Sequence, residues 1–589
     1  MPFDLSSIIS YIDGVGEVHL DRQPRGADAD PRGPAVVDPR GWLEQSWSDP
    51  AAFYAGLWQA TLGAKLPQLK SCAFASYDLY GDTVARHRGD GHAALRWYDP
   101  DDGPQVLSYA ALHARAVVLA GLWAGLGASP GATVCILAAP SAELLVGLAA
   151  ALHLGLCISL LPPQGPAALQ RRLLALAPDL IAADRGYLPL ARALKLRLLP
   201  LRNPEGVGAP PPRSHTYGAK EPLLRLCSPM AAAADAVHTL SADGAVLPAL
   251  RDGLLLLSLR PGDVVAAPGY ALEQHLPALL LVILLCGATL LHLELRHLQT
   301  RPHLLQLTPI RSLGISPALR DVLASAPAGL LRDVQRWFRD PAEPYARDPW
   351  QRLAARQGLS DLPGANLHFD DRAGGCLLFS PRRRELAHQE VLPAPGCALP
   401  LLDLSQSGQA ALGKVSVFAG NILLLRAARG FLFGGGLSPR RAGRVYPAQE
   451  VCAAASGLPF VRGAVVVAVP GGDGDHRFVL LVFTGAAGVT SEARAQHGQA
   501  VLRCLLDALG EGPLPDHCEV YPLYPHRSAE PADGDAAAPD EAWCLSQHLR
   551  GMLHRKAQRP VFRLLTELRA SAVPPPTRRA ATLGPLPTY

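Results

Sequence analysis

Lysine is scarce in this chain of 589 residues. Only six lysines stand among 55 basic residues, so arginine carries almost all of the positive charge. The 55 basic and 51 acidic residues nearly balance, which leaves a formal net charge of +4. No basic stripe interleaved with aromatic residues follows the chain, so we expect no nucleic-acid partner. The arginine excess, with abundant alanine, glycine and proline, is typical of a GC-rich genome rather than of arginine chemistry.

The cysteines lack any paired spacing. All 11 stand singly, without a C-x-x-C pair or the spacing of a metal site. They are therefore interpreted as small buried hydrophobic residues in a reducing compartment. The first residues lack a basic region followed by an apolar core, so no secretion signal is predicted. We expect a cytoplasmic protein.

Long apolar runs are missing as well. The nearly apolar run 276–291 is shorter than the roughly 20 residues that a membrane-spanning helix needs, and Pro277 and Gly287 interrupt it. It predicts a buried helix and a buried strand that meet near Gly287, and no membrane span. Hydrophobic residues make up 49% of the chain and charged residues 18%, which indicates a globular protein of several domains.

Strands alternate with helices after residue 105. The predicted order is a strand from Gln105, a helix to about Leu126, a strand at 132–137, a helix from Ser141 to His153 and a strand at 156–161. Ser108 or a neighbour is expected to cap the first of these helices. The alternation predicts βαβ units and a mostly parallel sheet. Aromatic residues at helical spacing in 42–58 predict a helical cap that precedes them.

An ordered series of motifs runs along residues 40–525. It includes Leu-Ser-Tyr-x-x-Leu at 107–112, Leu-Gly-x-x-Pro-Gly-x-x-Val at 126–134, Ala-Pro-Ser-x-Glu-Leu-Leu at 139–145, Leu-Arg-Pro-Gly-Asp at 259–263 and Gly-Ile-Ser-Pro-Ala-Leu-Arg at 314–320. The series resembles the AMP-forming acyl-CoA synthetase superfamily, the ligases that activate a carboxylate as an acyl-adenylate. The tryptophan-rich stretch 42–58 is similar to the N-terminal cap of the acetyl- and acetoacetyl-CoA synthetase branch.

The resemblance implies an α/β protein of the adenylate-forming ligase fold, with a large body of mixed and parallel sheets and helices and a small α+β C-terminal domain. The implied parts are an N-terminal extension and helical cap at 1–100, an AMP-binding-like body at 101–420, a small domain at 421–535, C-terminal helices at 536–572 and a disordered tail at 573–589. The basic centre of the C-terminal helices, 550–559, is interpreted as a solvated face or, alternatively, a binding patch.

The phosphate loop of the family falls on 227–237 when its motif Thr-Ser-Gly-Thr-Thr-Gly-x-Pro-Lys-Gly-Val is aligned without a gap. Such a loop needs glycines, hydroxyls and a lysine around the phosphates. Ser228 and Val237 keep the family residue, but Asp235 replaces the lysine and would place a negative charge beside the anion. The alanine-rich stretch 230–236 predicts a short helix rather than a phosphate site.

The other nucleotide-site motifs are altered too. The turn that contacts adenine and the metal in the family, Gly-Gly-Thr-Glu or Gly-Gly-Thr-Asp, corresponds to Gly374, Gly375, Cys376 and Leu377, so a leucine replaces the carboxylate. Acidic and basic residues at 370–372 are candidate substitutes, with a solvated loop as the alternative.

Four further positions of the family's nucleotide site can be compared with this sequence. The ribose-binding aspartate corresponds to Asn421, whose amide can hydrogen-bond a hydroxyl but brings no charge. The hinge aspartate corresponds to Ser438, and Arg444, Arg440 or Arg441 is a candidate for the nucleotide-site arginine from a shifted position. No lysine stands at 523–530, where the catalytic lysine is expected.

Several losses of this kind argue against ATP-dependent ligation, because each missing charge-stabilising donor costs about 3–4 kcal/mol. No G-x-S-x-G or H-E-x-x-H motif replaces them, and His238 and His275 are interpreted as loop or helix-end residues. We therefore assign no catalytic or metal-binding residue and no cofactor.

The favoured hypothesis is a pseudoenzyme, an acyl-CoA synthetase-like protein that binds an acyl group, an acyl-CoA, a carrier protein or an active paralogue. The alternative is an active AMP-forming acyl-CoA or acyl-AMP ligase with relocated catalytic residues, which would use ATP, Mg²⁺ and CoA.

Overall fold

The protein is described by a computed structural model, which forms two units. One comprises 1–162 and 176–437, and the other 163–175 and 438–589. The described residues are Ile12, 39–63, 76–202, 213–227, 237–340, 347–382, 390–397, strand segments between 401 and 441, 444–470, 476–484, 490–510 and 514–521, apart from 274, 363, 371 and 372.

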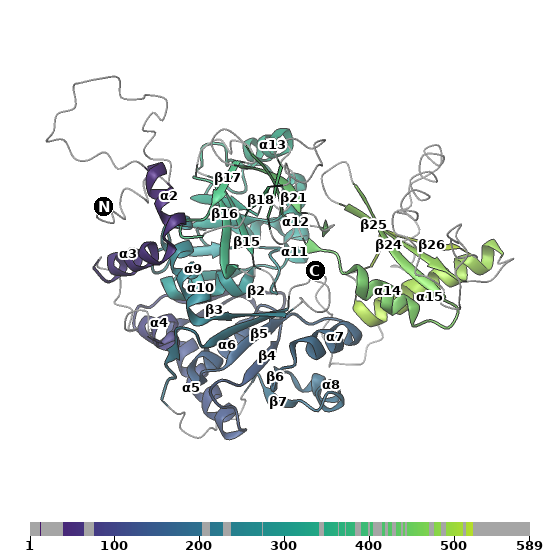
Figure 1. Ribbon diagram of the computed structural model, residues 1–589, viewed down its shortest axis with the longest axis horizontal. Helices are drawn as coiled ribbons and strands as arrows, with labels where there is room; N and C mark the ends of the chain where they lie inside the picture. Colours follow the sequence, from purple (N-terminus) through teal and green to yellow (C-terminus); the bar gives the residue numbers. More distant parts are fainter. Residues whose placement is uncertain are drawn as a thin grey trace. The chain divides into compact units, whose positions relative to one another are not determined.

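The larger unit contains a 13-stranded sheet with the order β18-β19-β20-β21-β17-β16-β15-β14-β13-β11-β12-β2-β3. Figure 1 labels several of its strands, among them β15, β16 and β17. The strands from β15 to β2 in this order are parallel, and the remaining pairings are antiparallel. Their bounds are β2 Ala93–Asp99, β3 Gly103–Ser108, β11 Val264–Ala266, β12 Thr289–His292, β13 Ser312–Ile315, β14 Arg336–Arg339, β15 Gly364–Asp370, β16 Gly375–Phe379, β17 Glu390–Pro393, β18 Leu401–Asp403, β19 Val415–Phe418, β20 Ile422–Arg426 and β21 Phe431–Gly436.

A second, six-stranded sheet of this unit has the order β10-β9-β5-β4-β6-β7. It is parallel except for the antiparallel pair of β9 and β10. Its strands are β4 Thr133–Leu137, β5 Cys157–Leu161, β6 Leu180–Ala183, β7 Arg197–Pro200, β9 Pro222–Cys227 and β10 Val237–Ser241, and a separate pair joins β1 Ser76–Tyr77 to β8 Tyr217–Gly218. The predicted α/β class with mixed and parallel sheets is confirmed.

Local signals in the sequence place the first helices correctly. Ser108 caps α5 (Tyr109–Gly125) and Ser141 caps α6 (Ala142–Leu154), each through a side-chain oxygen that accepts a backbone N–H of the first turn. Gly155 ends α6 in the left-handed conformation, with φ +75°, which a residue without a Cβ adopts at little cost. The predicted alternation of strand and helix is therefore confirmed here.

The apolar run 276–291 forms α10 (Leu276–Cys286) followed by β12, with Gly287 in the left-handed conformation between them. Every residue of α10 is buried, as expected of a helix that is apolar all round. In the part of the chain that the structure describes, no helix is both long and apolar enough to cross a membrane.

The tryptophan-rich stretch forms two helices, α2 (Pro39–Ser48) and α3 (Pro50–Gly63), as predicted. Phe53 lies edge-on to Trp42, with ring centroids 5.6 Å apart. The indole of Trp47 donates to the backbone oxygen of Pro393 at 3.2 Å, which fixes this cap to the body of the unit.

The other helical segments of the unit are short. They are α4 Leu79–Thr83, η1 Ala85–His87, η2 Arg185–Tyr187, α8 Leu188–Ala193, α9 Ala242–Arg251, the π-helix η3 Asp252–Leu256, α11 Leu295–Thr300, η4 Pro302–Gln306, α12 Pro317–Ser325 and α13 Arg347–Gln357. Helix α9 continues directly into η3, and both pack against α10 through the main hydrophobic core.

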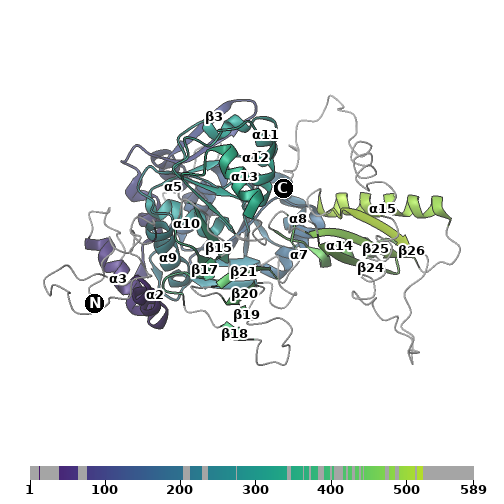
Figure 2. The same cartoon turned by 90° about the horizontal axis from the view of Figure 1, so that it is seen from above.

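The smaller unit is built on the sheet β24-β25-β26 (Figure 2). Its elements are α7 Pro166–Leu176, β22 Arg440–Arg441, β23 Arg444–Val445, α14 Ala448–Ser456, β24 Gly463–Pro470, β25 His476–Phe483, α15 Ser491–Leu509 and β26 His517–Tyr521. Strand β25 pairs antiparallel with β24 and parallel with β26. One face of this sheet packs against α14 and α15 through side chains that include Val466, Leu480 and Val501.

Candidate functional site

The carboxyl ends of the parallel strands in the large sheet define the first place to look for a site. Strand β11 lies between β12 and β13 in the sheet. The chain adds β12 on one side of β11 and then adds β13 on the other side, so the strand order reverses at β11. Open α/β sheets bind ligands outside the carboxyl ends of the strands at such a switch point. The residues that follow β11, β13 and β14 there include His275, Ser316 and Asp340.

Three buried polar side chains meet at this edge. Asp340 follows β14, His275 precedes α10, and His368 lies on the neighbouring strand β15. His275 Nε2 lies 2.8 Å from Asp340 Oδ2, and His368 Nδ1 lies 2.8 Å from Asp340 Oδ1. Relative exposures of 4% for His275, 5% for Asp340 and 1% for His368 place the cluster inside the protein.

The hydrogen bonds fix the protonation of this cluster. His275 Nδ1 accepts the backbone N–H of Ala271 at 3.1 Å, so its Nε2 must carry the proton that Asp340 accepts. Both nitrogens of His275 are therefore engaged, and this ring is not poised to act as a general base. Burial favours the neutral acid at Asp340, but the charge of His368 and hydrogen bonds from both histidines outweigh it and hold the pKa of Asp340 below its usual range.

Ser316 does not offer a nucleophile beside this cluster. Its hydroxyl donates to the backbone oxygen of Pro268 at 2.8 Å and accepts the N–H of Leu319 as the cap of α12. The hydroxyl is buried and its geometry is that of a helix cap. The edge of the sheet thus holds satisfied polar groups that tie α10, β14 and β15 together, rather than an exposed catalytic group.

The stretch matched to the phosphate loop connects two antiparallel strands. Cys227 ends β9 and pairs with Val237, the first residue of β10. Ser228 and Asp235 lie outside the described residues, as does the stretch 230–236 that the sequence predicts to be a short helix. His238 is part of β10, so its interpretation as a loop or helix-end residue is wrong. That interpretation is correct for His275, which stands at the N-terminal end of α10.

The turn matched to the adenine and metal contact lies between β15 and β16. Gly374 sits in the turn with φ +66°, and Gly375, Cys376 and Leu377 begin β16. A Cβ on Gly374 would clash with the backbone oxygen of Gly244 in α9. A Cβ on Gly375 would lie 2.5 Å from Asp252 Oδ2, closer than any ordinary contact. Close packing of α9 and η3 therefore accounts for both glycines.

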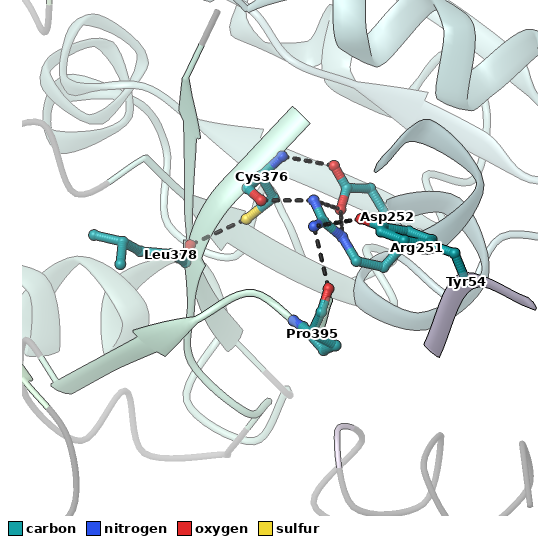
Figure 3. A network of polar contacts seen from close by, with 6 residues as sticks. All are labelled: Tyr54, Arg251, Asp252, Cys376, Leu378 and Pro395. Carbon is teal, nitrogen blue, oxygen red and sulfur yellow. Dashed lines mark hydrogen bonds and ion pairs between the residues drawn. The ribbon is translucent and has the colours of Figure 1, made fainter. Parts of the chain in front are cut away.

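A buried ion pair holds this turn from behind (Figure 3). Arg251 Nε donates to Asp252 Oδ1 at 2.7 Å, and the two side chains are 2% and 0% exposed. Asp252 Oδ2 accepts the backbone N–H of Cys376 at 2.6 Å, while Arg251 Nη2 donates to the Cys376 oxygen at 2.6 Å. Both backbone polar groups of Cys376 are therefore bound by side chains of the same protein.

The same arginine also reaches the helical cap. Its Nη1 donates to Tyr54 Oη on α3 and to the Pro395 oxygen, each at 3.3 Å. Burial raises the pKa of the Asp252 carboxyl, and the adjacent Arg251 guanidinium opposes that rise. A guanidinium with four acceptors around it is satisfied, which is the condition for burying such a charge.

At the position where the family has its metal-side carboxylate, the structure places Leu377. Leu377 is 3% exposed within β16, so its position faces the interior of the unit. Asp370 ends β15 and is only half-buried, and residues 371 and 372 lie outside the described residues. Within the described segments, no group of three His, Cys, Asp or Glu side chains is arranged to hold a metal ion.

The remaining predicted positions belong mainly to residues that the structure leaves undescribed. Asn421 and Ser438 lie outside the described residues, and Arg444 is placed only as a backbone position of β23, opposite Arg441. Arg441 donates from Nη2 to Asp516 Oδ2 at 2.7 Å, and its guanidinium lies 4.9 Å from the centroid of the Tyr446 ring. This arginine is therefore committed to the core of the smaller unit.

Sequence reasoning missed Asp340, His368 and the pair Arg251–Asp252. An Arg-Asp dipeptide at the end of a buried helix and an aspartate directly after a strand were visible signals. Their partners come from strands and helices distant along the chain, so no spacing in the sequence joins them.

Comparisons with known proteins support the fold. No protein-family model matches the sequence, and no curated protein matches it. Among solved structures, the chain is similar to a double mutant of o-succinylbenzoate CoA synthetase (MenE) from Bacillus subtilis bound with its product analogue OSB-NCoA. The TM-score is 0.55 at 13% sequence identity, and the match covers 74% of this chain and 94% of that chain.

This similarity confirms the predicted adenylate-forming ligase fold. In all, 510 chains of solved structures match, and a fold so widely shared does not by itself define a function. The predicted relation to the acetyl- and acetoacetyl-CoA synthetase branch stays a prediction, because the match at 13% identity is to a synthetase for another acid.

Proposed function

We propose that this chain is an acyl-CoA synthetase-like protein that has lost ATP-dependent carboxylate adenylation. In this proposal it acts as a binding protein for an acyl group, an acyl-CoA, a carrier protein or an active paralogue. The proposal combines the ligase fold with the altered residues at each position where the family's nucleotide chemistry is expected.

The observation that carries the proposal is the packing around Cys376. A nucleotide site works by offering free backbone and side-chain groups in an open crevice. Here Asp252 takes the Cys376 N–H, Arg251 takes the Cys376 oxygen, and all three residues are at most 2% exposed. Arg251 and Asp252 therefore bind the backbone of the turn itself and are not directed at a ligand.

The residues at two other positions of the nucleotide site also argue against ATP binding. The sequence between β9 and β10 has Asp235 where the family has its phosphate-binding lysine, so attraction for a triphosphate would become repulsion. A buried leucine, Leu377, stands where the metal-side carboxylate is expected. Magnesium would lack a ligand there, because it binds through oxygen atoms.

The competing proposal is an active ligase with relocated residues. It requires an arginine near the nucleotide from among Arg440, Arg441 and Arg444. Arg441 pairs with Asp516 and lies against the stacked rings of Tyr446 and Phe478, which leaves Arg440 and Arg444 as the remaining candidates of this proposal.

The test is the thermal stability of the purified full chain with Mg-ATP, AMP or CoA at millimolar concentration. A ligand that binds only the folded state stabilises it by RT ln(1 + [L]/Kd), about 2.7 kcal/mol at 100 times Kd. Magnesium pyrophosphate serves as the matched control for polyanion binding without a nucleoside. We expect no shift with ATP or AMP beyond this control, and a shift with CoA would identify the retained pocket. A clear shift specific to Mg-ATP would overturn the proposal.

A further inference from the structure

The edge of the six-stranded sheet is basic. Strand β7 is the last in the sheet order, and it lies beside both α5 and α8 (Figure 1). The stretch 192–202, which runs from the end of α8 through β7, has no acidic residue. Its four basic residues, all with exposed side chains, are Arg192, Lys195, Arg197 and Arg202. Asp179 and Asp184, the nearest acidic residues before this stretch, flank the neighbouring strand β6. The edge therefore concentrates positive charge in a chain whose basic and acidic residues nearly balance.

Most of this charge is not neutralised by the described residues. The side chains of Arg192 and Lys195 form no hydrogen bond or ion pair with them. Arg202 lies 3.5 Å from the Glu143 carboxylate, but the same carboxylate lies 3.6 Å from Arg115 on α5. One acidic side chain is therefore shared by two arginines, and the edge can attract an anionic partner.

An exposed leucine lies beside these charges. Leu126 directly follows α5 and is 42% exposed. Arg197 Nη1 donates to the backbone oxygen of Leu126 at 2.7 Å, which places the two residues side by side. The turn around it, 125–131, is Gly-Leu-Gly-Ala-Ser-Pro-Gly and has no charged residue. Peripheral proteins bind membranes through this combination, because apolar side chains enter the interface while basic side chains attract anionic lipids.

Protection of a sheet edge accounts for only part of this pattern. Charged side chains on an edge strand prevent it from pairing with another chain, and Arg197 on β7 fits that role. Arg192, Lys195 and Arg202 lie outside the strand, and such protection needs no exposed leucine. A single-stranded nucleic acid fits poorly as well, because neither 125–131 nor 192–202 has an aromatic residue on which a base could stack.

We propose that this edge binds the surface of a membrane that contains anionic phospholipids. The residues that make the contact are Leu126, Arg192, Lys195, Arg197 and Arg202. The basic side chains lie at the level of the lipid phosphates, and Leu126 enters the boundary between headgroups and acyl chains. The contact is peripheral and reversible, because one leucine and a few basic side chains anchor a protein far less strongly than a spanning helix. The proposal does not depend on whether adenylation is lost.

Sedimentation of the purified full chain with vesicles tests this contact. Vesicles of phosphatidylcholine alone are compared with vesicles of phosphatidylcholine and phosphatidylglycerol, each at low and at high salt. We expect the protein to sediment with the anionic vesicles, to bind the neutral vesicles much more weakly, and to lose much of the difference at high salt. An absence of binding to the anionic vesicles, or equal binding to both kinds, would overturn the proposal.

A double substitution tests the basic residues. Each basic residue near an anionic surface strengthens partitioning about fivefold, so Arg192→Glu with Lys195→Glu should weaken binding to the anionic vesicles by about 25-fold or more. The matched control is Arg352→Glu with Arg503→Glu, which changes the net charge equally at exposed positions on α13 and α15. Equal losses in the two double variants would show that net charge alone attracts the vesicles, and the assignment to this edge would be wrong.

A substitution of the leucine separates a lipid surface from an acidic protein as the partner. Leu126→Ser removes the side chain that enters the membrane, and we expect binding to the anionic vesicles to fall about tenfold. Leu307→Ser is the control, because Leu307 is also exposed, at 38%, in another part of the larger unit, and it should bind like the unmodified protein. Unchanged binding of Leu126→Ser would indicate a purely electrostatic contact, such as an acidic protein makes, and would overturn the assignment of a lipid surface.

Discussion

Asp252 and Cys376 are joined by a hydrogen bond in which the carboxylate accepts the backbone N–H at 2.6 Å. The contact links the π-helix that follows α9 to the first residues of β16. It is completed by Arg251, which neutralises the carboxylate and binds the carbonyl of the same cysteine. This connection, with the close approach of Asp252 to Gly375, accounts for the tight packing at the start of β16.

Breaking the Arg251–Asp252 pair should be strongly destabilising. Asp252→Asn leaves a buried guanidinium without its counter-charge, which typically costs about 3–5 kcal/mol of unfolding free energy. Urea unfolding followed by tryptophan fluorescence measures the change. Asp321→Asn is the matched control, because Arg320–Asp321 is also an adjacent pair but Asp321 is 70% exposed. Similar losses in the two variants would show that burial of the Arg251–Asp252 pair is unimportant.

The glycine at the start of β16 should be intolerant of a single methyl group. Gly375→Ala places a Cβ 2.5 Å from Asp252 Oδ2 and 2.9 Å from Pro248 Cβ, and overpacking of this kind costs about 1–3 kcal/mol. Gly186→Ala is the control, because its Cβ would meet no atom within 4 Å. Thermal unfolding of both variants decides the matter, and an unchanged midpoint for Gly375→Ala would contradict the close packing.

Stability should decline between pH 6.5 and 4 because of His87. Burial, followed by the charge of Arg86, lowers the pKa of His87 to about 4. Arg86 Nε donates to His87 Nε2 at 3.0 Å, so the native ring must keep that nitrogen unprotonated. The unfolded chain binds a proton below about pH 6.5 while the native state does not, so stability falls as the pH drops through this window.

Two histidine variants test whether His87 causes this loss of stability. His87→Gln should flatten the stability profile between pH 6.5 and 4, whereas His303→Gln, at an exposed position, should keep the profile of the unmodified protein. Guanidinium titrations at a series of pH values give both curves. Parallel curves for His87→Gln and the unmodified protein would refute the assignment.

Asp340 should control stability at lower pH. Its pKa is depressed in the folded state, so its contribution is fully present above the unfolded pKa of about 3.9 and is lost as the pH falls below it. Asp340→Asn should therefore be about 3–5 kcal/mol less stable at neutral pH and should lose less stability on acidification. Asp333→Asn, at an exposed carboxylate, provides the comparison. If the unfolding free energy of Asp340→Asn fell as steeply on acidification as that of the unmodified protein, the role given to this carboxylate would be contradicted.

The sequence predicted local structure best where the signal is local. Ser108 and Ser141 cap helices, and Gly287 ends α10, because each needs only neighbours within a turn to act. The order of strands and helices followed from the same signals and confirmed the α/β class. The ligase fold was predicted from the series of motifs, and the solved structure supports it.

The polar clusters could not be predicted in the same way. Asp340 meets His275 across 65 residues and His368 across 28, and both contacts depend on how β14 and β15 pair. Gly375 is constrained by Asp252 on a distant π-helix. His238 was misassigned because the alanine-rich stretch before it suggested a continuing helix or loop, whereas pairing with β9 makes it a strand residue.

The most direct test of the central claim is ATP–pyrophosphate exchange with the purified full chain, Mg²⁺ and a panel of short, long and aromatic carboxylates. Exchange requires reversible formation of an acyl-adenylate, so it detects adenylation without any need for the thiol acceptor. We expect no carboxylate-dependent exchange above a control without protein. Exchange that depends on one carboxylate, and that is lost on heat denaturation, would contradict the account and show that the ligase chemistry persists.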